Sequence, residues 1–270
     1  MKNLILIVFF IVAFSSCGKN SGPLVEKNLE NGEKILYDLN SNKPYSGKLV
    51  QVANNEAGFK YIHFEKHYRR GKIHGKLIEY YGNGQIKMEG ESRNGLPVGI
   101  WREFFPNGSI KKITEYNDGL RVNLQKEFYE NYQLKSEKSY FEGLLHGKSL
   151  SYSPDGQLLE VGSYENDLKS GEWVQYYSNG NVRISTSFYQ GLDHGEQIEY
   201  NSDGTIHIIV NFHLGKMNGK IRKFHSNDQI SFTGAFKDNF PSGIWQYFNE
   251  SGNLITEEDW DYILENRRNN

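Results

Sequence analysis

The sequence repeats the same residue types every 24 residues, without a slip, from Gly71 to Gly252. Glycines recur at fixed places in each period, and one position is always aromatic: Tyr80, Phe104, Phe128, Tyr152, Tyr176, Tyr200, Phe224 and Phe248. Eight units in register indicate a repeat architecture, in which each unit buries its apolar surface against its neighbours. A residue type that the period itself dictates needs no catalytic explanation.

Each unit is predicted to form a β-hairpin. In the second unit, two runs rich in aromatic and β-branched residues, 100–105 and 109–116, flank the turn signal Pro106-Asn107-Gly108. This pattern predicts a three-residue loop whose glycine is left-handed. Tyr132 stands at the glycine position of the third unit, where a left-handed conformation is unfavourable, so that loop is expected to be distorted.

The loop length sets the pairing of the two strands of each hairpin. With a three-residue loop, Phe104 faces Ile110 and Glu103 faces Lys111. By strand alternation, the aromatic column that includes Tyr116 lies on the same face as Phe104. We expect this face to be the main apolar one and the opposite face to mix tryptophans with charges.

The N-terminal residues have the pattern of an export signal. Lys2 precedes an apolar run at 4–14, which is shorter than the about 20 residues that span a bilayer. The small residues at 15–16 precede Cys17, so the segment resembles the lipobox of a bacterial lipoprotein. That resemblance implies cleavage before Cys17, lipid on Cys17 and an outer-membrane location facing either the periplasm or the cell surface. The alternative is an ordinary signal peptide with an incidental cysteine.

Charge and cysteine content exclude several classes of protein. The formal net charge is −2, and it becomes −3 when a signal carrying Lys2 is removed. The sequence therefore gives no basic stripe for nucleic acid and little attraction to anionic lipids, so lipid on Cys17 is the expected membrane attachment. With one cysteine in 270 residues, no intramolecular disulfide can form.

The residues that could suggest an active site follow the repeat. His74, His146 and His194 share one repeat position, and repeats lie about 9.6 Å apart in a regular sheet, too far for a common metal ion. The column that contains Glu79 and Glu103 is expected to form cross-strand ion pairs. No nucleophile elbow, phosphate loop or zinc-protease motif occurs. We expect no catalytic residue, no metal and no cofactor.

Surface aromatics are the remaining candidates for function. Exposed aromatic side chains in a row often mark binding sites. The candidate binding surface on the mixed face consists of Trp101, Phe105, Trp173, Tyr177 and Trp245. The alternative is that these side chains pack against neighbouring repeats.

The spacing Gly-x-x-x-Gly-x-Trp-x-x-aromatic-aromatic-x-Asn-Gly resembles the bacterial variant of the MORN repeat. The resemblance implies an all-β fold, an elongated single-layer antiparallel sheet of successive 24-residue hairpins. A short helix over 259–264 and a segment at 25–39 are expected to cap its ends. The predicted organisation is a signal peptide (1–16), a lipid-anchored tether and N-terminal cap (17–42), a repeat domain (43–262, with a degenerate unit at 43–70 and eight units from 71) and a tail (263–270).

Two functions compete. The first is a non-enzymatic, lipid-anchored envelope protein whose sheet binds another protein or a glycan. The second follows from the family resemblance, since many such chains are labelled antitoxins (YwqK-type), which implies a toxin as the partner. Phospholipid recognition, which the family name suggests, lacks a basic patch in the sequence.

Overall fold

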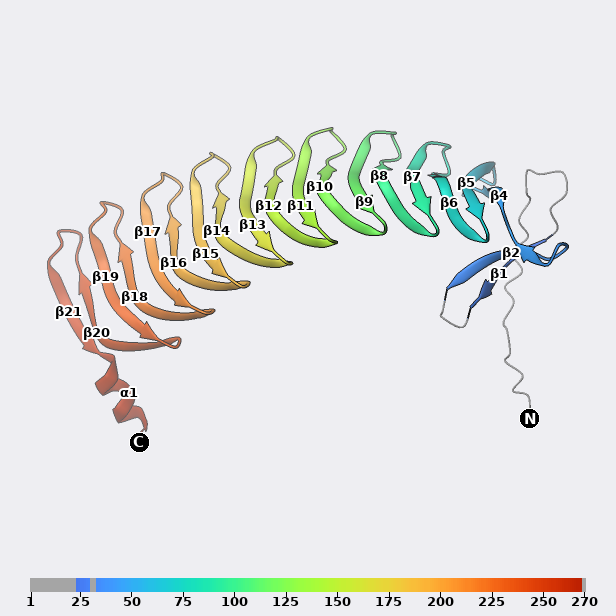
Figure 1. Cartoon of the computed structure of the whole chain (residues 1–270). Coiled ribbons are helices and arrows are strands. Elements are labelled where there is room, and N and C mark those ends of the chain that lie inside the picture. The colour runs from blue at the N-terminus through green and yellow to red at the C-terminus, as the bar shows by residue number, and fades with distance from the viewer. Residues whose placement is uncertain (1–22, 30–32, 269–270) are drawn as a thin grey trace, which may run out of the picture. The chain divides into compact units, whose positions relative to one another are not determined.

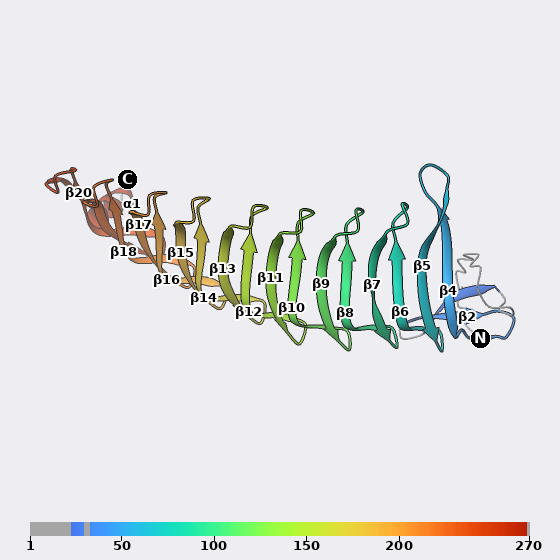
Figure 2. The same cartoon turned by 90° about the horizontal axis from the view of Figure 1, so that it is seen from above.

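The computed structural model describes residues 23–29 and 33–268 (Figure 1). These residues form two compact units that divide after Tyr132. Residues 1–16 and Cys17, on which the signal and lipid predictions rest, lie outside the described residues. In each unit the strands lie side by side in a single layer (Figure 2). The prediction of an all-β fold of successive antiparallel hairpins is confirmed. No described helix has the length and apolarity needed to cross a membrane.

Unit 1 contains a small sheet and a run of consecutive hairpins. The small sheet consists of β1 (Leu24–Asn28), β2 (Lys34–Asp38) and β3 (Lys43–Pro44). The larger run consists of β4 (Gly47–Asn54), β5 (Lys60–Arg69), β6 (Lys72–Tyr80), β7 (Ile86–Arg93), β8 (Leu96–Phe104), β9 (Ile110–Asn117) and β10 (Leu120–Phe128). Each of these strands pairs antiparallel with the next, as the repeat requires.

Unit 2 continues the same pattern and ends in a helix. Its strands are β11 (Leu134–Phe141), β12 (Leu144–Tyr152), β13 (Leu158–Glu165), β14 (Leu168–Tyr176), β15 (Val182–Tyr189), β16 (Leu192–Tyr200), β17 (Ile206–His213), β18 (Lys216–Phe224), β19 (Ile230–Lys237), β20 (Phe240–Phe248) and β21 (Leu254–Asp259). The helix α1 (Trp260–Arg268) begins where Asp259 Oδ1 accepts the backbone N–H groups of Asp261 and Tyr262 at 3.1 and 3.2 Å. It runs beyond the expected residue 264, so much of the predicted tail is helical.

The three-residue loops form as predicted, but the register beyond them differs by one residue. Phe104 pairs with Ile110, as expected, whereas Glu103 pairs with Lys112 and not with Lys111. A β-bulge at Lys111 inserts one extra residue into the returning strand, and the same irregularity recurs in the other hairpins. Because the bulge recurs at the same place in successive hairpins, the 24-residue period does not reveal it.

The bulge also changes which residues share a face. It reverses the alternation after Ile110, so Tyr116 lies on the face of Trp101, and the two rings meet at 6.2 Å. The prediction that Tyr116 shares a face with Phe104 was therefore wrong. The prediction of the main apolar face was also wrong. Phe104 is half-buried, whereas Trp173, which lies on the face that bears the tryptophans, is 3% exposed.

Two-residue turns connect the hairpins. In the turn between β7 and β8, Asn94 and Gly95 both have positive φ, at 53° and 89°. Two successive left-handed residues make a type I′ turn, whose twist matches that of the flanking strands. The first glycine column of the period therefore exists for these turns.

The loop at Tyr132 keeps the ordinary conformation. Tyr132 has φ of 68°, and its N–H donates to the Tyr129 carbonyl at 3.1 Å, as Gly108 donates to Phe105 at 2.9 Å. The expected distortion is absent, and the tyrosine itself adopts the left-handed conformation. Its side chain is 73% exposed, so no side-chain burial offsets the backbone strain.

The small N-terminal sheet packs onto the first hairpins of unit 1. Leu24, Leu36, Tyr45, Leu49 and Phe64 form one buried cluster, and Tyr68 packs against it. Burial, the carboxylate of Glu26 and the neighbouring Tyr45 raise the pKa of Tyr68 to about 12. Leu36 N–H donates to the Gly71 carbonyl at 2.9 Å, which ties β2 to the turn before β6.

Candidate binding surfaces

The three tryptophans of the candidate binding surface lie on the packed face of the hairpins. We call the sheet face that bears Trp101 in unit 1, and the one that bears Trp173 and Trp245 in unit 2, the tryptophan face of that unit. Trp173 and Trp245 are 3% and 8% exposed, and Trp101 is half-buried. The three rings pack against neighbouring strands, which is the alternative arrangement that the sequence left open.

Each tryptophan ring lies flat on a glycine of the preceding strand. A Cβ atom on Gly90, Gly162 or Gly234 would lie 2.3, 2.1 and 2.3 Å from Cδ2 of Trp101, Trp173 and Trp245, respectively. We call each of these contacts a Gly–Trp lock. The indole N–H of Trp173 also donates to the Ser163 carbonyl at 3.0 Å, so the polar edge of the ring is satisfied.

Other hairpins fill the same two positions with different pairs. Thr114 and Gln125 occupy them in unit 1, where Thr114 Oγ1 donates to Gln125 Oε1 at 3.5 Å. Thr186 and Gln197 stand opposite each other in the strand register of unit 2. The Gly–Trp and Thr–Gln pairs each recur at every third repeat, so three hairpins form a longer period on the tryptophan face.

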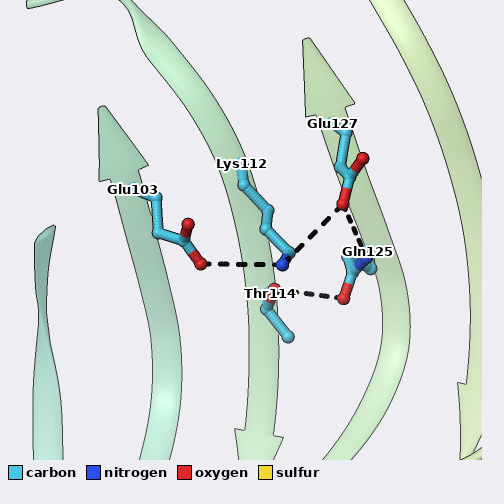
Figure 3. A network of polar contacts seen from close by, with 5 residues as sticks. All are labelled: Glu103, Lys112, Thr114, Gln125 and Glu127. Carbon is cyan, nitrogen blue, oxygen red and sulfur yellow. Dashed lines mark hydrogen bonds and ion pairs between the residues drawn. The ribbon is translucent and has the colours of Figure 1, made fainter. Parts of the chain in front are cut away.

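A polar network continues from the Thr114–Gln125 pair across three strands (Figure 3). Lys112 on β9 lies between two carboxylates, 3.6 Å from Glu103 on β8 and 3.7 Å from Glu127 on β10. Gln125 Nε2 donates to Glu127 Oε1 at 3.5 Å. All five side chains therefore have partners, which favours a structural role over a catalytic one.

Phe105 and Tyr177 lie away from the tryptophans, next to the three-residue loops. Both are half-buried. The Tyr177 hydroxyl donates to the Tyr200 carbonyl at 2.7 Å and so connects two repeats. Lys111 approaches the Phe105 ring with its Nζ 5.8 Å from the ring centroid. The five candidate residues therefore do not form one surface.

Sequence reasoning overlooked the two-residue turns, which line one edge of the hairpins. In unit 2, seven large apolar side chains beside these turns are 41–65% exposed: Phe141, Leu144, Leu168, Tyr189, Leu192, Leu214 and Phe240. We call this set the apolar turn edge. Leu168 lies over Gly191 and Leu192 over Gly215, with Cδ2 3.3 and 3.5 Å from the position of an added Cβ. The leucines thus follow one another from turn to turn.

The histidines that share a repeat position lie on separate hairpins, at His74 on β6, His146 on β12 and His194 on β16. The His194 ring meets the His213 ring at 5.0 Å, and its Nδ1 is buried without a hydrogen-bond partner. Across residues 23–29 and 33–268, no group of three or more His, Cys, Asp or Glu side chains is placed to hold a metal ion.

Four segments match the sequence model of the MORN repeat variant: residues 73–94, 97–118, 145–166 and 169–189. They form two pairs displaced from each other by three repeats, the longer period seen on the tryptophan face. The matches support the family resemblance for these repeats and the coarse interpretation of a repeat-based binding scaffold. Among curated protein sequences, none matches the chain.

The chain is similar to short stretches of much longer chains in solved structures. The chain is 11% identical to a chain in the crystal structure of TcdB2-TccC3-Cdc42, over 87% of this chain and 15% of that one, with a TM-score of 0.21. For the Photorhabdus luminescens Tc holotoxin pore, the identity is 12% over 86% of this chain and 14% of that one, with a TM-score of 0.18. The chain thus spans less than a fifth of the length of either relative.

Proposed function

We propose that this chain is a non-enzymatic, lipid-anchored protein of the bacterial envelope whose repeat sheet binds another protein. The observation that carries the binding role is the apolar turn edge of unit 2. Exposed apolar side chains gathered on one edge of a fold commonly mark protein contacts. Acidic and basic residues, among them Glu142, Asp193 and Lys216, stand in the same turns and would form a polar rim.

A protein partner is favoured over a glycan. Glycan sites use flat aromatic rings that are open to solvent, and the rings of Trp101, Trp173 and Trp245 are packed on glycines. The apolar turn edge instead offers mainly leucine side chains, with two phenylalanines and one tyrosine, about one repeat apart, a spacing that suits the side chains of a partner lying along the edge.

The test compares matched pairs of leucines in the two units. Leu168→Ser/Leu192→Ser removes two members of the apolar turn edge, which are 49% and 47% exposed. Leu96→Ser/Leu120→Ser changes the same repeat position in unit 1, where the leucines are 50% and 51% exposed. Both variants and the unchanged chain are cross-linked in cells and recovered from envelope fractions, after circular dichroism has shown that they fold.

We expect a specific cross-linked protein with the unchanged chain and with the unit 1 variant, and its loss with the unit 2 variant. Identical partners for all three proteins, or recovery of free monomer alone, would refute the proposal. Relief of a toxic neighbouring reading frame by co-expression would identify the partner as a toxin. The anchor is tested separately with a palmitate analogue, which should label the unchanged chain and not Cys17→Ala.

A further inference from the structure

The first two hairpin turns of unit 1 place basic side chains around one hollow. The hollow measures about 660 Å³ and is lined by Arg69, Arg70, Lys72, His74, Arg93 and Asn94. Arg69 and Arg93 are one repeat apart and so occupy the same place in successive turns. The cluster forms in a chain of net charge −2, so it is a local feature and not the result of a basic composition.

The backbone holds these turns firmly. Arg70 has φ of 51°, and its N–H donates to the Ser46 hydroxyl at 2.9 Å. Gly71 N–H donates to the Tyr45 carbonyl at 2.7 Å, and a Cβ at this glycine would lie 2.0 Å from Ile35 Cγ2. The N-terminal sheet therefore packs directly against the turn and fixes where the arginines stand.

Few carboxylates pair with these basic side chains. Lys72 pairs with Glu33 at 2.7 Å, but the structure gives no ion pair to Arg69, Arg70 or Arg93 among residues 23–29 and 33–268. Like charges held close together repel one another, and a bound anion relieves that repulsion. The repulsion between these basic side chains therefore destabilises the fold locally, and a bound anion would reduce that repulsion.

We propose that this hollow binds a ligand that carries two or more phosphate groups. Guanidinium groups present N–H donors in a planar fork that fits phosphate oxygens with two hydrogen bonds. Three arginines exceed what one carboxylate can neutralise, whereas each phosphate group brings about −1.5 to −2 charges and three acceptor oxygens. The His74 ring in the lining is held in place by the turn itself, since its Nδ1 accepts a hydrogen bond from the Asn94 N–H at 3.4 Å.

The test uses tripolyphosphate as the soluble probe and the full chain as the protein. Arg69→Gln/Arg93→Gln removes two positive charges from the hollow. Lys87→Gln/Lys111→Gln removes the same charge elsewhere in unit 1, on exposed side chains of the hairpin bulges. Affinity is measured by calorimetry at low and moderate salt, and the thermal unfolding midpoint is measured with and without the probe.

We expect the unchanged chain and the lysine variant to bind tripolyphosphate with similar affinity and to gain thermal stability from it. The arginine variant should bind roughly tenfold or more weakly, and its unfolding midpoint should not move. Equal binding by all three proteins, or no binding by the unchanged chain at low salt, would overturn the proposal.

Vesicles distinguish the source of the phosphate. Neutral phosphatidylcholine vesicles, with and without cardiolipin, which carries two phosphate groups, are sedimented with each protein after Cys17 has been replaced in Cys17→Ala. Binding to the cardiolipin vesicles that the arginine variant loses supports a membrane ligand. Binding of tripolyphosphate without vesicle binding supports a soluble one. Vesicle binding that the arginine variant retains contradicts the role of the hollow.

Discussion

The Gly–Trp lock can be tested by exchanging it for the pair that the next repeat uses. Gly162 and Trp173 form one lock, and Thr186 and Gln197 occupy the equivalent positions one repeat later. The backbone at Gly162 is not left-handed, so a threonine there meets no backbone penalty. Any cost of Gly162→Thr must therefore come from Trp173.

The structure sets the size of that cost. The added Cβ would stand 2.1 Å from Trp173 Cδ2, where the ring is 3% exposed and meets Tyr164 at 5.0 Å and Lys169 Nζ at 4.0 Å. Overpacking costs about 1–3 kcal/mol, and removing a buried tryptophan costs about 3–5 kcal/mol. We expect Gly162→Thr and Trp173→Gln each to lower the free energy of unfolding by roughly 3 kcal/mol.

The double variant should be more stable than either single variant, because threonine and glutamine fit together in this register elsewhere in the chain. We expect a coupling free energy of about 2–3 kcal/mol. Urea unfolding of the full chain followed by far-ultraviolet circular dichroism measures it, since fluorescence would change with the tryptophan itself. Repeat arrays can unfold in parts, so amide exchange in β13 and β14 provides a local check. The reverse exchange, Thr186→Gly/Gln197→Trp, is the matched control. Additivity within about 0.5 kcal/mol in both cycles would refute the lock.

Two further predictions concern tyrosines of unit 1. Tyr132→Gly should stabilise the chain by about 1 kcal/mol, because glycine takes the left-handed conformation without strain. Asp118→Ala, at a left-handed position of a two-residue turn, should destabilise the chain. Urea midpoints measure both effects, and a loss of stability in Tyr132→Gly would contradict the reasoning. The pKa of Tyr68 is raised from 10.0 to about 12, so its contribution to stability is complete below pH 10 and is lost as the pH rises toward 12. Tyr68→Phe should flatten the fall in the unfolding midpoint above pH 10, and an unchanged pH profile would exclude Tyr68 as its cause.

The 24-residue period correctly predicted the features that depend on a few neighbouring residues, namely the loops and the strand pairing next to them. Residue types at the three-residue loops specify the turn, and the turn specifies that Phe104 faces Ile110. The bulge at Lys111 could not be predicted in this way, because a column of mixed residues after the loop carries no sign of an extra residue. One inserted residue then exchanged the faces of Tyr116 and of the whole aromatic column to which it belongs.

The binding surfaces were hard to predict for a similar reason, because they depend on which strands and turns become neighbours. The tryptophans looked like an exposed row because the glycines beneath them stand on another strand. A separate irregularity in the pairing of β7 with β8, where the register shifts between Glu89 and Glu91, brings Gly90 under Trp101. The basic hollow was hidden by a net charge close to zero. The spacing of Arg69 and Arg93 by one repeat was a usable signal, since residues at the same place in adjacent repeats become neighbours at one edge.

The alternation of the locks also limits how such a chain can change its length. Each lock joins the second strand of one unit to the first strand of the next, so its two members belong to different units. Duplication of residues 95–118 alone would place Thr114 beneath a second copy of Trp101, where the threonine methyl and the indole would compete for the same space. Gain or loss of three consecutive repeats keeps every glycine under its tryptophan. Changes of length by groups of three hairpins are therefore compatible with the packing, whereas duplication of the single hairpin that carries Trp101 is not.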